Sequence, residues 1–159
     1  MKYKALFLDL DGTTISNKRD GMPSERVREA IHKAKSKVFV CVATSRPLPF
    51  AKPVLDNLDI RGMCSVNDST QIYDPVKGKI VNTIYLDYHD LTEIIDVFSH
   101  YLVPLFVGDG LEEHKYNRRK GLPKNICVLG GENISESLAD EMIARLTKIS
   151  AIAVHKVFS

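Results

Sequence analysis

The chain has 159 residues, of which 44% are hydrophobic, enough for one ordinary domain or two small ones with a real core. Its 22 basic and 20 acidic residues nearly balance, which argues against binding nucleic acid or a membrane surface through bulk charge. The longest apolar run, residues 38–43, is too short to cross a bilayer, and Asp9 interrupts the N-terminal run, so no signal peptide is expected. Three widely spaced cysteines, Cys41, Cys64 and Cys127, favour reduced thiols in a cytoplasmic protein over a disulfide framework or a zinc site.

The first half of the chain alternates between continuous apolar runs, typical of buried parallel strands, and segments with apolar residues at helical spacing. We expect strands at 3–8, 38–43 and 62–66, with helices opened by Pro23 and Pro47. Strand, helix, strand, helix, strand is the order of a doubly wound α/β sheet with right-handed crossovers.

The second half has a different pattern, which predicts an α+β arrangement with antiparallel strands. It begins with a hairpin whose connection contains Pro75 and Gly78. The further expected elements are an amphipathic helix at 88–102, strands at 104–108 and 125–129, a basic loop at 114–121, a helix opened by Asn133 and Glu136 at capping-box spacing, and a closing strand at 151–158. We therefore place the domain boundary between residues 82 and 83, giving parts 1–82 and 83–159.

The segment LDLDGTT, directly after the first expected strand, concentrates the candidate chemistry. Asp9 and Asp11 are two residues apart, so in an extended chain their side chains point to the same side, at the strand end where open α/β sheets bind ligands. Converging carboxylates are tolerated around a cation, and Mg²⁺ suits such oxygen ligands together with a substrate phosphate. One carboxylate is able to attack phosphorus and the other to transfer protons, while Gly12 permits a sharp turn and Thr13 offers a hydroxyl and an amide to the phosphate. The plainer alternative is that both acids are turn formers that end the strand.

LDLDGTT resembles the first motif of the haloacid dehalogenase (HAD) superfamily, most of whose members are phosphatases. The resemblance implies that Asp9 is the nucleophile and a Mg²⁺ ligand. It also implies that Asp11 is the general acid/base and binds the metal through its backbone carbonyl.

Two further strand ends support the resemblance to the Cof-type sugar phosphatases of that superfamily. Thr44, Ser45 and Arg46 follow the second expected strand and are similar to the family's Thr-Gly-Arg-Pro form, with serine in place of glycine. The resemblance implies that Thr44 holds the phosphoryl oxygens and that Ser45 and Arg46 lie with it in the phosphate and substrate site. Asn67, after the third expected strand, matches an asparagine that faces the substrate, although Asp68 stands where glycine is usual. A simple turn role remains open for Asn67.

A second acidic segment, FVGDGLEEH, contains Asp109 and Glu113 and looks like the superfamily's last motif, which completes the metal site. That motif is expected about twenty residues after a lysine at a helix start, and this window has no lysine. The segment instead resembles a strand of the cap domain in the Cof-type proteins, which implies that Asp109, Glu112 and Glu113 are surface or substrate-lid residues. The basic run at 115–120 is interpreted as a solvated loop and not as a nucleic-acid site.

The resemblance extends over nearly the whole chain but only over the N-terminal part of the family fold. It implies a partial doubly wound core at 1–82 and an α+β cap at 83–159, without the second half of the core. One edge of the sheet is then expected to be uncovered, which makes self-association through that edge possible.

The resulting hypothesis is a Mg²⁺-dependent HAD phosphatase that acts on a small phosphorylated metabolite, such as a sugar phosphate, through an aspartyl-phosphate. It has no nucleic-acid or membrane partner. A phosphomutase of the same superfamily and a catalytically inactive fragment that serves as a binding module remain as alternatives.

Overall fold

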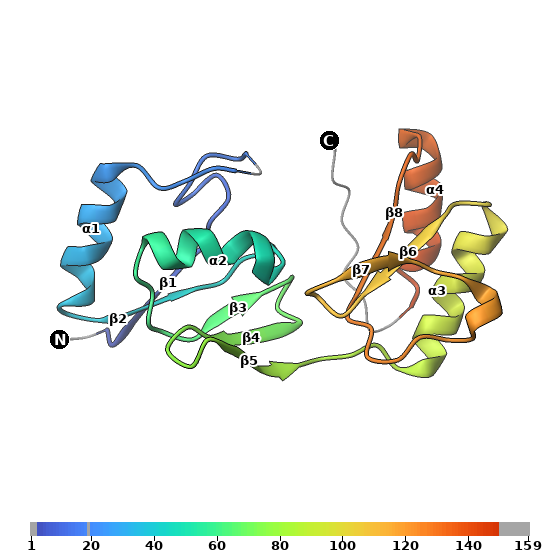
Figure 1. Ribbon diagram of the computed structural model, residues 1–159. Coiled ribbons are helices and arrows are strands. Elements are labelled where there is room, and N and C mark those ends of the chain that lie inside the picture. Colours follow the sequence, from blue (N-terminus) through green and yellow to red (C-terminus); the bar gives the residue numbers. More distant parts are fainter. Residues whose placement is uncertain (1–2, 19, 150–159) are drawn as a thin grey trace. The chain divides into compact units, whose positions relative to one another are not determined.

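The computed structural model describes residues 3–18 and 20–149 (Figure 1). Contacts divide the chain into a first unit that ends at Ile84 and a second that begins at Tyr85, each with its own hydrophobic core. The interpretation of the two parts as half core and cap stays a prediction, and the expected closing strand lies outside the described residues. In the described part of the chain, no helix is long and apolar enough to cross a membrane.

The first unit has the expected strand–helix order, which produces part of a parallel sheet. Its elements are β1 (Ala5–Leu8), α1 (Glu25–Lys35), β2 (Phe39–Val42), α2 (Leu48–Asn57) and β3 (Cys64–Val66). β1 and β2 pair in parallel, and a parallel bridge between Ala43 and Ser65 connects the end of β2 to β3. The predicted α/β class is thus confirmed, while only part of a doubly wound core is present in the described residues.

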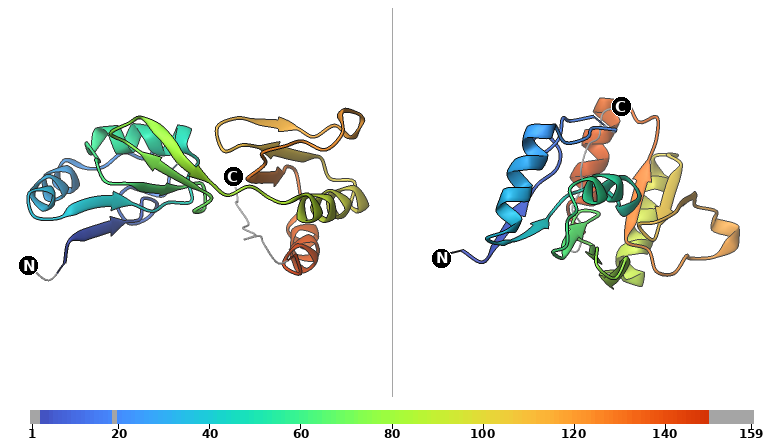
Figure 2. Two further views of the ribbon diagram at one scale, coloured as in Figure 1. Left: turned by 90° about the horizontal axis from the view of Figure 1, so that it is seen from below. Right: turned by 60° about the vertical axis from the view of Figure 1, so that its left-hand side comes forward.

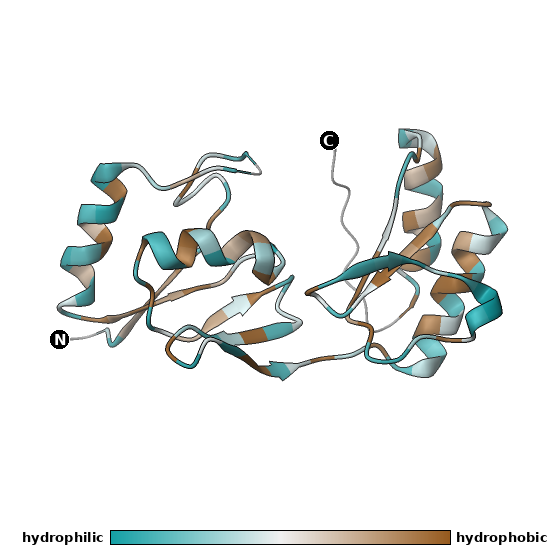
Figure 3. Cartoon of the chain, in the orientation of Figure 1, coloured by the Kyte–Doolittle hydropathy of each residue, from teal (hydrophilic) through white to brown (hydrophobic). Residues whose placement is uncertain are grey.

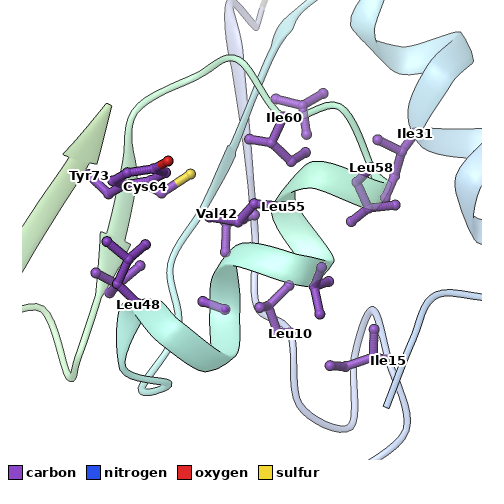
Figure 4. Close-up of a cluster of buried hydrophobic side chains, with 14 residues drawn as sticks. Leu10, Ile15, Ile31, Val42, Leu48, Leu55, Leu58, Ile60, Cys64 and Tyr73 are labelled. Carbon is purple, nitrogen blue, oxygen red and sulfur yellow. The ribbon is translucent and has the colours of Figure 1, made fainter. Parts of the chain in front are cut away.

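Helix α1 begins where its sequence supplies a cap, because the Ser24 hydroxyl accepts a hydrogen bond from the Val27 amide at 3.4 Å. Pro47 caps α2 with its fixed φ of −57°. Figure 3 shows hydrophobic and hydrophilic residues alternating around both helices. Their apolar faces pack with Val40 and Val42 of β2 into one buried cluster, so both helices cover the same face of the sheet (Figure 4).

The other face of the sheet is open, and the prediction that β1 is buried is wrong. Phe7 is 64% exposed and Phe39 of β2 is 74% exposed. The register pairs Ala5 with Phe39, so both aromatic side chains lie on one face, opposite the helices. An apolar run predicts burial only where a second layer packs on it, and the described residues leave these two uncovered. Self-association through the uncovered edge of the sheet, which is distinct from this open face, stays a prediction.

The predicted hairpin is confirmed as β4 (Gln71–Asp74) and β5 (Lys79–Thr83), which form an antiparallel sheet with β3. Gly78 has a φ of +64° in the connecting turn, a conformation that glycine adopts without steric cost. Tyr73 of β4 packs into the core of the first unit.

The second unit is an α+β arrangement, as predicted. Its elements are α3 (Tyr88–His100), β6 (Leu105–Gly108), β7 (Glu113–Lys115), the short 3₁₀ helix η1 (Arg118–Lys120), β8 (Val128–Gly131) and α4 (Glu136–Leu146). β6 lies between β7 and β8 and is antiparallel to both. Figure 2 shows α3 and α4 on the same side of this sheet, where Ile94, Val107 and Met142 join one buried cluster.

Three details of this unit correct the sequence prediction. Part of the expected basic loop is strand β7, whose residues are all exposed, so backbone pairing with β6 and not apolar patterning defines it. The strand expected at 125–129 begins at Val128. Helix α4 is capped by Ser135, whose hydroxyl accepts from the Leu138 amide at 3.4 Å, whereas Asn133 has a left-handed φ of 58° that does not suit an N-cap.

Candidate active site

The two candidate acids, Asp9 and Asp11, lie at the carboxyl end of β1. They flank Leu10, which anchors this segment in the core. Leu10 is fully buried, and its carbonyl accepts hydrogen bonds from the amides of Thr13, Thr14 and Ile15. This compact turn follows directly on the strand, with Gly12 at a φ of +71°. Since side chains alternate along an extended segment, Asp9 and Asp11 project away from the core that holds Leu10.

Asp9 is exposed, and the two threonines that follow hydrogen-bond to its side-chain carboxylate and to its backbone carbonyl. The Thr13 hydroxyl donates to Asp9 Oδ2 at 3.2 Å, and the buried Thr14 hydroxyl donates to the Asp9 carbonyl at 2.5 Å. The first contact holds one oxygen of the carboxylate, Oδ2, while the second holds the backbone. The sequence analysis singled out Thr13 and missed this structural role of Thr14. The adjacent pair of threonines in LDLDGTT is the one feature of the sequence that could have indicated it.

Asp11 has a different environment, because both of its carboxylate oxygens accept from Arg46. Arg46 Nε donates to Oδ2 at 2.8 Å and Nη2 donates to Oδ1 at 2.6 Å, a bidentate pair across 35 residues of sequence. The side chain of Arg46 is 10% exposed and that of Asp11 is 27% exposed. The hydrogen bond to Asp11 raises the pKa of Arg46, helped by the negative charges of Asp11 and Asp20. Sequence patterns gave no indication of this pairing.

Thr44 and Ser45 occupy the carboxyl end of β2, next to the start of α2. The Thr44 amide donates to the Ser65 carbonyl at 3.0 Å, and the buried Thr44 hydroxyl accepts from the Arg46 amide at 3.2 Å. The backbone hydrogen bond to Ser65 fixes this strand end against β3. Ser45 is exposed.

Asn67 follows β3 and is almost completely buried, with 2% of its surface exposed. Its amide N–H donates to the Arg46 carbonyl at 2.8 Å, and its side-chain Nδ2 donates to the Thr70 hydroxyl at 2.8 Å. These contacts connect the turn after β3 to the segment after β2. The structure therefore brings the ends of three neighbouring strands together, and the role of Asn67 toward a substrate stays a prediction.

Asp109 and Glu113 belong to the second unit, around the turn from β6 to β7. Asp109 Oδ1 accepts from the amides of Leu111 and Glu112 at 2.9 and 3.0 Å, which lowers the pKa of Asp109. Glu113 is the first residue of β7 and is exposed. Asp109 therefore caps the turn between β6 and β7, and the role of these two acids toward a metal or substrate stays a prediction.

The end of β1 offers carboxylate and carbonyl oxygens as donors for a cation. In the described residues, no three His, Cys, Asp or Glu side chains gather closely enough to hold a metal by themselves. Mg²⁺ commonly takes only one or two carboxylates and fills its shell with water and substrate oxygens. The exposed Asp9 carboxylate fits that donor set, whereas the Asp11 carboxylate is bound by Arg46, which leaves the backbone of Asp11 as its contribution.

Comparison with known proteins decides the family. A family model described as haloacid dehalogenase-like hydrolase matches residues 6–152, which is most of the chain. The chain belongs to this family. None of the curated proteins compared with this HAD-like hydrolase matches it.

Solved structures show the same fold at low sequence identity. A haloacid dehalogenase-like hydrolase from Bacteroides thetaiotaomicron is 17% identical with a TM-score of 0.69, and the match covers 93% of this chain and 66% of that one. A HAD subclass IIB sugar phosphatase is 16% identical with a TM-score of 0.63, covering 91% and 64%. A Thermotoga maritima protein is 21% identical with a TM-score of 0.55, covering 93% and 48%. This HAD-like hydrolase thus spans from about half to two thirds of the length of these relatives.

Proposed function

We propose that the protein is a Mg²⁺-dependent phosphatase of the Cof type that acts on a small phosphorylated metabolite such as a sugar phosphate. The observation that supports this most is the meeting of Asp9, Asp11 and Thr44 at the carboxyl ends of the parallel pair β1 and β2. Family membership and the likeness to a sugar phosphatase agree with it.

Asp9 is the nucleophile in this proposal. Its carboxylate is exposed, and Thr13 holds one of its oxygens, so the other is available to attack phosphorus. The new bond between Asp9 and phosphorus forms as the ester bond to the leaving oxygen breaks, and water then releases phosphate and restores Asp9.

Asp11 gives a proton to the leaving oxygen and later takes one from the attacking water. Thr44 orients the phosphoryl oxygens through its hydroxyl, at the start of α2. Bound Mg²⁺ supplies charge that offsets the repulsion between the carboxylate and the phosphate. The Asp9 carboxylate and the Asp11 backbone carbonyl are the groups that would hold it.

The test is hydrolysis of p-nitrophenyl phosphate by the full chain with and without MgCl₂. We expect release of p-nitrophenol that EDTA abolishes. Asp9→Asn removes the nucleophile and should lower kcat by about a thousandfold or more. Asp56→Asn is the matched control, because Asp56 is an exposed carboxylate on α2 paired only locally with Lys52, and it should keep full activity. Equal activity of Asp9→Asn and the unaltered chain would refute the assignment.

A further inference from the structure

The Asp11 carboxylate is not available for proton transfer in the state that the structure shows. Arg46 Nε donates to its Oδ2 at 2.8 Å and Nη2 donates to its Oδ1 at 2.6 Å, so both oxygens are occupied as acceptors. In such a pair the carboxylate is ionised, and an ionised carboxylate has no proton to give. This is therefore a resting state, and Asp11 takes part in a reaction only after it leaves Arg46.

Of the two partners, Arg46 is the fixed one. Its Nη2 also donates to the Lys18 carbonyl at 2.7 Å, its amide donates to the Thr44 hydroxyl at 3.2 Å, and its carbonyl accepts from the Asn67 amide at 2.8 Å. These three contacts do not involve Asp11, so they persist when its carboxylate moves. The side chain of Asp11 is 27% exposed and that of Arg46 only 10%. Opening the pair is therefore a movement of Asp11 away from a guanidinium that stays in place.

A second anion has to take the position that Asp11 leaves. The Arg46 side chain is nine-tenths buried, and a buried guanidinium without an anionic partner is strongly unfavourable. Its planar fork accommodates two phosphate oxygens as well as two carboxylate oxygens, and a phosphate carries more negative charge. Asp9 lies two residues before Asp11, which separates their Cα atoms by at most about 7 Å. A phosphoryl group that replaces Asp11 on Arg46 is thus within reach of the proposed nucleophile.

We propose that the Arg46–Asp11 pair is a latch, which the phosphate of the substrate opens by exchange. In the resting chain the Asp11 carboxylate occupies the anion site of Arg46. The phosphate displaces it, and the released carboxylate becomes available to the leaving oxygen and to water. This inference rests on the proposed phosphatase function, and it makes the release of Asp11 depend on the presence of substrate.

A permanent structural tie between the two loops makes a different prediction. If the pair never opens, phosphate does not contact Arg46, and removal of the Asp11 carboxylate affects phosphate only through the loss of a nearby negative charge. If the pair is a latch, the carboxylate competes with phosphate for one guanidinium, so the apparent Kd of phosphate is raised in proportion to the share of closed chains. The two accounts differ in whether the effect of Asp11 requires Arg46.

The experiment measures the Kd of inorganic phosphate for the full chain by isothermal titration calorimetry in the presence of MgCl₂. Asp11→Asn should lower this Kd about tenfold or more, because it removes a competitor bound by charge-assisted hydrogen bonds. In an Arg46→Gln background, the same substitution should change the Kd by less than about twofold. Asp20→Asn is the matched control, because it removes the same charge from a carboxylate that acts on Arg46 from outside the bidentate pair. It should lower the Kd by less than about fivefold.

The Arg46 Nε–H signal in a heteronuclear NMR spectrum, identified by its loss in Arg46→Gln, reports the exchange directly and should shift as phosphate saturates the unaltered chain. An unchanged Kd in Asp11→Asn, a gain that persists without Arg46, or a signal that phosphate does not move would overturn the latch and leave the phosphatase assignment intact. Absence of Mg²⁺-dependent hydrolysis of p-nitrophenyl phosphate by the unaltered chain would instead overturn the assignment, and with it the role of the latch in a reaction. Circular dichroism verifies that each variant is folded.

Discussion

At the residue scale, the turn after β3 holds three successive residues in a left-handed conformation. Asn67, Asp68 and Ser69 have φ angles of 55°, 51° and 68°. Such angles cost a residue with a Cβ about 1–2 kcal/mol, and asparagine and aspartate tolerate them better than serine does. The buried Asn67 amide is compensated by its hydrogen bond to Thr70, which fixes the turn that supports Arg46. Strain is therefore placed next to the residues assigned to catalysis.

Ser69→Gly should relieve part of this strain. We expect the free energy of unfolding of the first unit to rise by about 0.5–1 kcal/mol, because glycine removes the steric cost but loses more chain entropy on folding. Urea denaturation is the measurement. Ser36→Gly is the matched control, since Ser36 has a right-handed φ of −73° and should lose stability on the same change. A loss at both positions would show that the left-handed turn is not strained at Ser69.

At the element scale, the turn of the β4–β5 hairpin depends on one carboxylate. Asp74 is 5% exposed, and its Oδ1 accepts from the amides of Val76 and Lys77 at 3.0 and 3.1 Å, while Lys77 Nζ lies 3.3 Å from Oδ2. The backbone hydrogen bond from Lys77 is the main cause that lowers the pKa of Asp74. Ionised Asp74 therefore stabilises the folded hairpin.

The sign of the pH dependence follows from that lowered pKa. The stabilisation is complete above the unfolded value of about 3.9 and is lost as the pH falls through the folded pKa. At pH 7, Asp74→Asn should have a lower urea midpoint of unfolding than the unaltered chain. This gap between the two midpoints should narrow below about pH 4. The exposed Asp56→Asn change should show a smaller gap at pH 7. A gap for Asp74→Asn that is constant from pH 7 to pH 3 would contradict this account.

The elements that the sequence predicts best are those defined by local chemistry. LDLDGTT predicts a strand end with two acids because strand, turn and carboxylates all lie within seven residues, and the turn at Gly78 is equally local. Arg46 and Asp11 are brought together only by the pairing of β1 with β2, so their hydrogen bonds depend on tertiary structure. The predicted N-cap of α4 was wrong because Asn133 and Ser135 are both residue types that cap helices well. Only the backbone φ angle, left-handed at Asn133, distinguishes them.

At the scale of the whole molecule, burial was the property that composition predicted least well. Phe7 and Phe39 belong to apolar runs but are exposed, because burial depends on what packs against a face and not on the residues of that face alone. Ile94 and Leu55, by contrast, lie at helical spacing and are 2% and 1% exposed. They belong to two separate cores, one in each unit.

Two separate cores predict that the units lose structure independently. Ile94→Ala leaves a cavity in the second core and should lower its free energy of unfolding by about 2–5 kcal/mol. Amide hydrogen exchange, followed by mass spectrometry, should then accelerate in β6 and remain unchanged in β2. Leu55→Ala is the matched control in the first core and should accelerate exchange in β2 alone. If either substitution accelerated exchange equally in both strands, the chain would unfold as one cooperative body, and a cavity in one unit would destabilise the other as well.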